Sequence, residues 1–182
     1  MSDTIRKGLY IVGILSNFLR GGKIAATAPK CEPLAVYAPA NGTVISMGEF
    51  PDAVFSQEIL GPGCGILPTG KTVFAPFNGT VIQAVDTLHA VGLASEDGLE
   101  LLIHVGVDTV DMAGKGFRYH VKNGQKVHLG DPLIEFDSGV IRAAGHSDAI
   151  AVVVTNSDDF SGMELENLGE VKHGELILKG KK

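Results

Sequence analysis

The sequence has no tryptophan, few aromatic residues (6%) and only two cysteines among its 182 residues. Cys31 and Cys64 form no CxxC pair, which excludes a thiolate zinc knuckle and gives no disulfide framework. A single bridge between them is the alternative that the sequence leaves open. Two cysteines outside any disulfide framework suit a reducing cytoplasm. Basic residues are outnumbered, 15 against 21 acidic ones, and the body of the chain has no basic run interleaved with aromatics. This composition argues against nucleic acid as a partner.

The amino terminus has no apolar run long enough to cross a bilayer, because its uncharged stretch covers only residues 8–19. On a helical wheel the apolar side chains of this stretch gather opposite Arg6 and Arg20, which is typical of an amphipathic helix. We expect residues 4–19 to form such a helix and to contact an anionic membrane surface. A helix packed on the domain and a secretory signal peptide are the alternatives. The chain is therefore divided into a tail and linker, residues 1–32, and a domain, residues 33–182.

Glycine is abundant, 24 of 182 residues, and after Pro33 short apolar runs alternate with Gly, Pro, Asn and Asp. This pattern predicts an all-β fold: a single antiparallel β-barrel or sandwich. Short helical turns are expected near residues 109–113 and 140–144. The expected strands cover residues 34–37, 43–46, 65–67, 72–75, 80–85, 90–95, 99–105, 133–136, 151–155 and 176–179.

One phrase occurs twice: residues 37–45 and 74–82 share A-P-x-N-G-T-V-I, 37 positions apart. Asn-Gly supplies the positive φ angles of a tight turn, and Thr-Val-Ile begins a strand. We interpret the copies as two equivalent corners of a pseudo-symmetric barrel or sandwich. Residues 123–136 add the spacing V-x-x-G-x-x-L, which also occurs in lipoyl and biotinyl carrier domains. The sequence lacks the M-K-M or D-K phrase that such a carrier needs.

No metal-binding or nucleotide-binding motif in the sequence survives inspection: no P-loop is expected, and HExxH, GxSxG and HxH are absent. The useful feature is a relation between two histidines. If residues 95–98 close a four-residue hairpin turn, Ala94 pairs with Leu99 and His89 lies opposite His104. Directly opposed residues share a face of the sheet, with Cβ atoms about 4.5–5.5 Å apart. The two imidazoles are therefore expected to be neighbours.

A pair of imidazoles can carry phosphoryl chemistry. A neutral imidazole is a nucleophile near pH 7, and a second ring can donate a hydrogen bond to a developing anion. Thr87, Asp108 and Thr109 lie close enough in the sequence to orient the rings. The alternative is a cross-strand pair that only packs.

Residues 98–110, with His104 at their centre, resemble the phosphohistidine signature of the glucose-type IIA proteins of the bacterial sugar phosphotransferase system. Residues 87–90 are similar to the second histidine segment of that family, and residues 51–55 and 68–70 also match its phrases. The resemblance covers about residues 39–160.

This resemblance implies that His104 accepts a phosphoryl group from the phosphocarrier protein HPr and passes it to a cysteine of the IIB domain of a sugar permease. His89 would stabilise the phosphohistidine, Thr87 would support His89, and the carbonyl of Gly106 would fix the tautomer of His104. Asp108 completes the expected catalytic set. The family also implies a cytoplasmic protein, here peripheral to the membrane through its tail.

Docking of these partners is expected on an apolar surface. The resemblance assigns Val54 and Phe55 to it. Val85, Val91 and Leu102 stand beside the histidines, where family members often have phenylalanine. A different class of function is a regulatory binding module, whose unphosphorylated histidine face docks on permeases or metabolic enzymes and shares an interfacial zinc with a partner's carboxylate.

Overall fold

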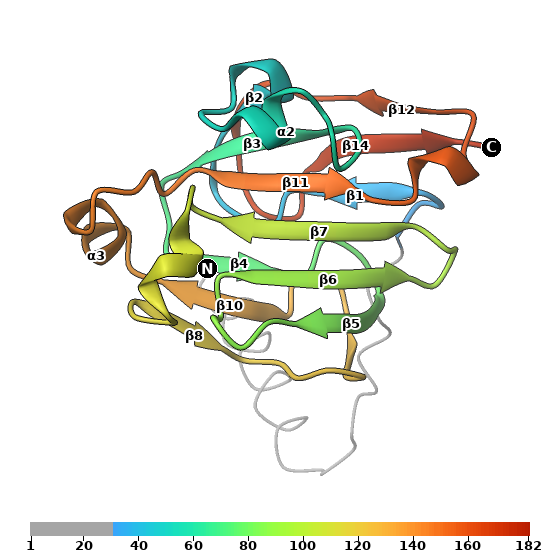
Figure 1. Cartoon of the computed structure of the whole chain (residues 1–182). Coiled ribbons are helices and arrows are strands. Elements are labelled where there is room, and N and C mark those ends of the chain that lie inside the picture. Colours follow the sequence, from blue (N-terminus) through green and yellow to red (C-terminus); the bar gives the residue numbers. More distant parts are fainter. Residues whose placement is uncertain (1–30) are drawn as a thin grey trace, which may run out of the picture.

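The computed structural model describes residues 31–182, which form antiparallel β-sheets joined by loops and short helical turns (Figure 1). The helix predicted over residues 4–19 lies outside the described residues. The strands are β1 (Ala35–Tyr37), β2 (Gly42–Ser46), β3 (Gly63–Pro68), β4 (Thr72–Phe74), β5 (Gly79–Ala84), β6 (Ala90–Ser95), β7 (Glu100–Val105), β8 (Phe117–Tyr119), β9 (Lys126–Val127), β10 (Pro132–Phe136), β11 (Ile150–Val154), β12 (Gly162–Leu165), β13 (Gly169–Val171) and β14 (Leu176–Lys181). The helical segments are η1 (Met47–Glu49), α2 (Ala53–Ser56), η2 (Thr109–Met112), α3 (Ser138–Ala143) and η3 (Ser157–Asp159).

The described strands form one large sheet of eight strands and two small sheets of three strands each. The large sheet has the order β13-β2-β3-β11-β7-β6-β5-β9, and Figure 1 shows its middle strands side by side from β3 to β5. The small sheets have the orders β1-β14-β12 and β4-β10-β8. All of these neighbouring strands run antiparallel, as the sequence predicts.

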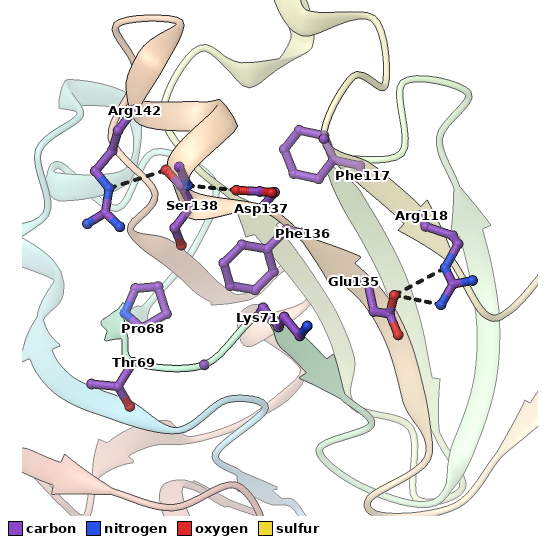
Figure 2. Close-up of a pocket in the computed structure, with 13 residues that line it drawn as sticks. Pro68, Thr69, Lys71, Phe117, Arg118, Glu135, Phe136, Asp137, Ser138 and Arg142 are labelled. Atoms are coloured by element: carbon purple, nitrogen blue, oxygen red, sulfur yellow. Dashed lines mark hydrogen bonds and ion pairs between the residues drawn. The ribbon is translucent and has the colours of Figure 1, made fainter.

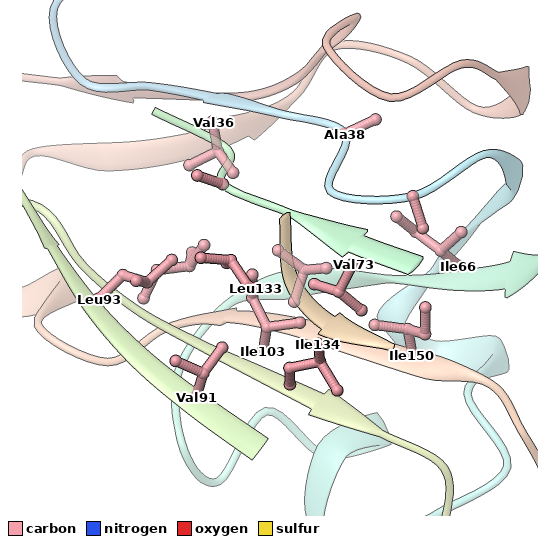
Figure 3. Packing of buried hydrophobic residues seen from close by; sticks show 14 of the residues in the cluster. Val36, Ala38, Ile66, Val73, Val91, Leu93, Ile103, Leu133, Ile134 and Ile150 are labelled. Carbon is pink, nitrogen blue, oxygen red and sulfur yellow. The ribbon is translucent and has the colours of Figure 1, made fainter. Parts of the chain in front are cut away.

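The main hydrophobic core lies between the inner face of the large sheet and the two small sheets (Figure 3). Val91 and Ile103 contribute from the large sheet, and Val36, Val73 and Leu133 contribute from the small ones. All five side chains are fully buried. Removal of this apolar surface from water is the main stabilising contribution to a sandwich of this kind.

The predicted strands all overlap observed ones, and the two predicted helical turns correspond to η2 and α3. The α3 helix begins after Asp137, whose Oδ1 accepts hydrogen bonds from the backbone N–H groups of Gly139 and Val140 at 2.8 and 3.0 Å. The sequence did not predict β8, β9, β12 and β13. These are two to four residues long and carry exposed charged side chains, so they present no apolar run: Arg118, Lys126, Glu164 and Glu170.

The register predicted for the β6–β7 hairpin is wrong by one residue. Ala94 pairs with Glu100 and Ala90 pairs with His104. The backbone N–H of Ser95 donates to the carbonyl of Leu99 at 2.8 Å, so the connecting loop has three residues rather than four. Gly98 adopts φ +94°, the left-handed conformation typical of three-residue hairpin loops. A shift of one residue moves the side chains of β6 to the opposite face.

The corrected register places Val91 and Leu93 in the core rather than beside the histidines. His89 still reaches the histidine face, because it precedes β6 and does not follow its pleat. Leu88 adopts φ +61°, and its N–H donates to the carbonyl of Val85 in a tight turn. The chain therefore enters β6 from an irregular turn, which the alternation of strand residues could not predict.

The two copies of the repeated phrase form equivalent corners, as predicted, but the positive φ angles expected of Asn-Gly are wrong: neither Gly42 nor Gly79 has one. One carries the chain from β1 in a small sheet into β2 of the large sheet, and the other does so from β4 into β5. The corners also bond to each other: Tyr37 N–H donates to the Pro76 carbonyl at 3.0 Å, and Phe74 N–H donates to the Pro39 carbonyl at 2.7 Å. This reciprocal pair links the two halves of the sandwich.

Gly42→Ala and Gly79→Ala are each expected to lower the free energy of unfolding by about 1–3 kcal/mol. An added Cβ would lie 2.2 Å from the carbonyl oxygen of Leu67 in the first case and of Ala94 in the second. Urea denaturation measures the effect. Gly48→Ala is the matched control, since nothing lies within 4 Å of its added Cβ. Unchanged stability in both corner variants would contradict the prediction.

Candidate functional site

His104 lies near the end of β7, on the outer face of the large sheet. Its neighbours in the strand, Ile103 and Val105, point into the main core. Across the sheet His104 pairs with Ala90 on β6 and with Ala151 on β11. Small side chains on both neighbouring strands leave room for the imidazole to stand on the sheet.

The tautomer of His104 follows from one hydrogen bond. Its Nδ1 lies 2.8 Å from the carbonyl oxygen of Gly106. Because a carbonyl only accepts, Nδ1 carries the proton and the neutral ring has its lone pair at Nε2. Gly106 adopts φ +82°, and a Cβ there would lie 2.3 Å from a side-chain carbon of Thr109. Glycine is required at this position for both reasons.

His89 lies beside that ring. The centroids of the two imidazoles are 4.6 Å apart and their planes meet at 78°. His89 is 7% exposed, and its Nδ1 lies 2.8 Å from the hydroxyl of Thr87. With Nδ1 engaged by Thr87, Nε2 is the nitrogen that remains for a bound anion.

Burial lowers the pKa of both rings. The pKa of His104 falls to about 4, because its surroundings exclude water and because His89 would repel a second positive charge. The hydrogen bond to Gly106 and the carboxylates of Asp52 and Asp108 oppose this shift. The pKa of His89 is also lowered by burial, against a hydrogen bond with the backbone of Thr87 that raises it. Neutral imidazole is therefore the resting form of His104 at pH 7.

An apolar cluster outside the main core supports the histidine pair. The Phe55 ring lies 5.2 Å from the His104 ring, and Phe50 packs edge-on against Phe55 at 5.4 Å. Asp52 starts the α2 helix that holds Phe55, since its Oδ1 accepts from the N–H groups of Val54 and Phe55 at 2.9 and 3.1 Å. The buried members of this cluster are Met47, Phe50, Phe55, Ala149, Ala151 and Val153.

Comparison with known proteins extends the sequence resemblance over most of the chain. Residues 34–160 match the family described as phosphoenolpyruvate-dependent sugar phosphotransferase system, EIIA 1. A glucose-specific EIIA component from Halalkalibacterium halodurans is 42% identical over 156 residues, which cover 86% of this chain and 89% of that protein. The chain belongs to the glucose-type EIIA family. It is a phosphoryl-transfer component of the sugar phosphotransferase system.

Other EIIA relatives agree in fold and in sequence. The solved structure of glucose permease IIA from Mycoplasma capricolum has a TM-score of 0.72 and 33% identity, covering 81% of this chain and 96% of that one. A glucose-specific EIICBA component from Staphylococcus saprophyticus is 42% identical over 144 residues, which are 79% of this chain and only 21% of that longer protein.

The residues expected to dock partners on this EIIA fall into three environments. Val54 is 44% exposed, whereas Phe55 is buried against His104. Val85 and Leu102 are half-buried, and Leu102 packs against the apolar cluster that contains Phe55. Val91 is fully buried in the main core, so its assignment to a docking surface is wrong, and the one-residue shift of the hairpin is the reason.

Asp108 lies beyond the turn that follows β7, with an exposed side chain and φ +55°. Its carboxylate raises the pKa of His104 only as one of the smaller contributions, so it acts on the ring through space.

Sequence reasoning missed Met47, Phe50, Ala151 and Val153 as supports of the site. The unbroken apolar run of β11, Ile150–Val154, is a usable signal, because such a run indicates a strand buried on both faces. Nothing in residues 47–50 predicts where that segment folds back.

A pocket of about 620 Å³ lies apart from the histidine pair in this EIIA, between residues 68–71, 116–118 and 135–142 (Figure 2). Residues 65–72 beside it match the P-loop spacing GxxxxGK[ST], with Lys71 as the lysine. A P-loop needs a helix after the glycine-rich turn, and here the chain enters strand β4. Arg118 is paired with Glu135, and Arg142 donates to the Ser138 carbonyl. The match to the P-loop spacing therefore does not indicate a nucleotide-binding site.

Residues 31–182 of this EIIA contain no cluster of three or more His, Cys, Asp or Glu residues that could hold a metal ion. In the same part of the chain no helix is long and apolar enough to cross a membrane.

The lowered pKa of His104 predicts that this EIIA loses stability in mild acid. An ordinary histidine titrates near 6.5, so between pH 6.5 and about 4 the unfolded chain binds more protons than the folded one. The contribution of His104 to stability is full above pH 6.5 and is lost as the pH falls toward 4. At pH 5 the loss is on the order of 1–2 kcal/mol.

Urea denaturation at pH 7 and pH 5 measures this difference. His104→Gln should lose less stability than the parent between the two pH values, because glutamine does not titrate. His128→Gln, in an exposed turn, is the control and should behave as the parent does. The same loss for His104→Gln as for the parent would show that His104 does not couple folding to pH.

Proposed function

We propose that His104 is the residue of this EIIA that carries the phosphoryl group, and that His89 stabilises that group during transfer. The observation that carries the proposal is the bond from His104 Nδ1–H to the Gly106 carbonyl, 2.8 Å long, beside a second imidazole at 4.6 Å. Together they provide a neutral nucleophile at Nε2 and a donor for the phosphoryl oxygens.

In the first step Nε2 of His104 attacks the phosphorus of a phosphoryl group held by HPr. The bond from phosphorus to HPr breaks as the new P–N bond forms, so His104 need not lose a proton. The imidazole gains positive charge when its lone pair is used. The Gly106 carbonyl and the carboxylates of Asp52 and Asp108 favour that charge, since they are the groups that raise the pKa of His104.

In the second step a thiolate of the IIB domain attacks the phosphorus, and the P–N bond to His104 breaks. The ring leaves as neutral imidazole with its proton still on Nδ1, which restores the starting state. Burial disfavours the positive charge on the phosphorylated ring, just as it lowers the pKa of His104. Burial thus raises the free energy of phosphorylated His104 enough for onward transfer. The Gly106 carbonyl and the carboxylates of Asp52 and Asp108 limit that rise.

HPr and a IIB domain are the partners that this role requires, and such partners place the protein in the cytoplasm. The family supports the assignment, and so does the Staphylococcus saprophyticus relative, whose name joins the C, B and A components in one protein. A histidine pair on the outer face of the sheet suits a carrier that serves two proteins in turn. Incubation with phosphoenolpyruvate, enzyme I and HPr, followed by intact mass, tests the role: a module that only binds its partners would gain no phosphate.

Replacement of His104 by Gln should abolish phosphoryl acceptance from phospho-HPr, because no other ring in the site has an Nε2 in position to attack. His89→Gln should still accept phosphate and should slow onward donation by about 10²–10³-fold, the usual effect of one lost electrostatic stabiliser. Rapid-quench assays with purified HPr and IIB measure both steps. Acid-labile phosphate on His104→Gln, with none on His89→Gln, would reverse the roles.

Val54→Glu should weaken the binding of HPr by roughly tenfold, because it places a charge on the exposed apolar surface beside Phe55. Leu168→Glu is the matched control: it is 63% exposed and lies beside β13, about 19 Å from β7 across four strand spacings. Titration calorimetry measures both affinities, and urea denaturation should show unchanged stability. Equal affinity for the two variants would remove Val54 from the docking surface.

A further inference from the structure

The turn that follows His104 is held by backbone hydrogen bonds to two other segments. Val105 N–H donates to the His89 carbonyl at 2.8 Å. Gly106 N–H donates to the Ala149 carbonyl at 2.8 Å, and Val107 N–H donates to the Ser147 carbonyl at 3.0 Å. The backbone after the nucleophile is thus tied to the turn that carries His89 and to the start of β11.

The side chain of Thr109 is buried inside this turn and bonds to its backbone. Its hydroxyl donates to the Val105 carbonyl at 2.6 Å, and the residue is completely buried. Its side-chain methyl occupies the space that a Cβ on Gly106 would need, at 2.3 Å. Among the described residues only Thr109 and His89 are polar and buried. A hydroxyl withdrawn from water in this way is retained only with a good partner.

The hydroxyl of Thr109 fixes the orientation of one peptide plane. In a trans peptide the C=O and N–H groups point in opposite directions. The plane between Val105 and Gly106 is therefore held on one side by Thr109 and on the other by Ala149. The next plane contains the Gly106 carbonyl that accepts from His104 Nδ1–H. Rotation of the first plane would move Gly106 and weaken that bond.

We propose that Thr109 is a positioning residue for phosphoryl transfer, whose hydroxyl holds the Val105–Gly106 peptide so that His104 keeps its proton on Nδ1 and its lone pair on Nε2. Thr109 bonds to Val105 rather than to either ring, so it acts only through the backbone. Because Val105 N–H bonds to the His89 carbonyl, the same hydroxyl also steadies the backbone that carries the second ring. The inference rests on the proposed role of His104.

Three substitutions separate the hydroxyl from the methyl of this side chain. Thr109→Val keeps the methyl that packs on Gly106 and loses the hydroxyl. Thr109→Ala loses both, and Thr109→Ser keeps the hydroxyl alone. Thr43→Val, on β2 and remote from the turn, is the control for loss of a threonine hydroxyl.

The first readout is the tautomer of His104, followed by ¹⁵N NMR of the ring. We expect the parent, Thr43→Val and Thr109→Ser to hold the proton on Nδ1, and Thr109→Ala and Thr109→Val to show a measurable Nε2–H population. The second readout is the rate of acceptance from phospho-HPr. It should fall roughly threefold to tenfold in the two variants without a hydroxyl, the effect of one hydrogen bond, and should recover in Thr109→Ser.

Parent-like tautomer and rate in Thr109→Ala and Thr109→Val would overturn the proposal. So would a loss in Thr109→Ser as large as in Thr109→Ala, since that result would assign the effect to packing of the methyl. If the Ala and Val variants do not fold, the spectrum of the parent still decides: a ring protonated mainly on Nε2 would overturn it. Failure of the proposed function is a separate result, because the parent would then gain no phosphate while its tautomer remained measurable.

Discussion

The site depends on the register of β7 between β6 and β11. Side chains alternate along a strand, so Leu101, Ile103 and Val105 can fill the core only if Leu102 and His104 lie on the outer face. A slip of one residue would bury the imidazole and expose three fully apolar side chains, at a cost of several kcal/mol. The core therefore places the nucleophile, and the alanines beside His104 on both neighbouring strands give it space.

Pseudo-symmetry organises the two corners of this glycine-rich chain. Each corner accepts a hydrogen bond from a glycine of a distant turn: Gly174 N–H donates to the Ala38 carbonyl and Gly130 N–H to the Ala75 carbonyl, both at 2.9 Å. The V-x-x-G spacing around Gly130 recurs around Gly174, at residues 171–174. The A-P-x-N-G-T-V-I corner and the V-x-x-G turn that bonds to it thus both occur twice. The reciprocal bonds of Tyr37 and Phe74 link the two corners.

Sequence patterns predicted what depends on local alternation and turn chemistry, namely the all-β class, the corners, and His104 with Gly106 on one strand end. They failed where a turn departs from the expected length. Gly98 shortened the β6–β7 loop by one residue, which moved Val91 from the predicted docking surface into the core. The neighbourhood of His89 and His104 was predicted correctly from a wrong register, because the left-handed turn at Leu88 brings His89 back to the histidine face. The fold of residues 47–60 over the outer face was beyond prediction, since it depends on contacts with strands far along the chain, such as Ala151 on β11.

The arrangement of polar and apolar groups suits chemistry that is completed by a partner. His104 rests on Phe55 with its Nε2 free of the hydrogen bond that engages Nδ1, and the exposed Val54 lies beside it. A docked protein would cover the surface around His104 and Val54 and exclude water from it. Exclusion of water strengthens the interaction of His89 with a phosphoryl group. The hydrogen bonds of Thr87 and Gly106 are already formed before docking, so the rings need little reorganisation when the partner arrives. Preorganisation within the chain and desolvation by the partner are therefore separate contributions, and only the first is built into the fold.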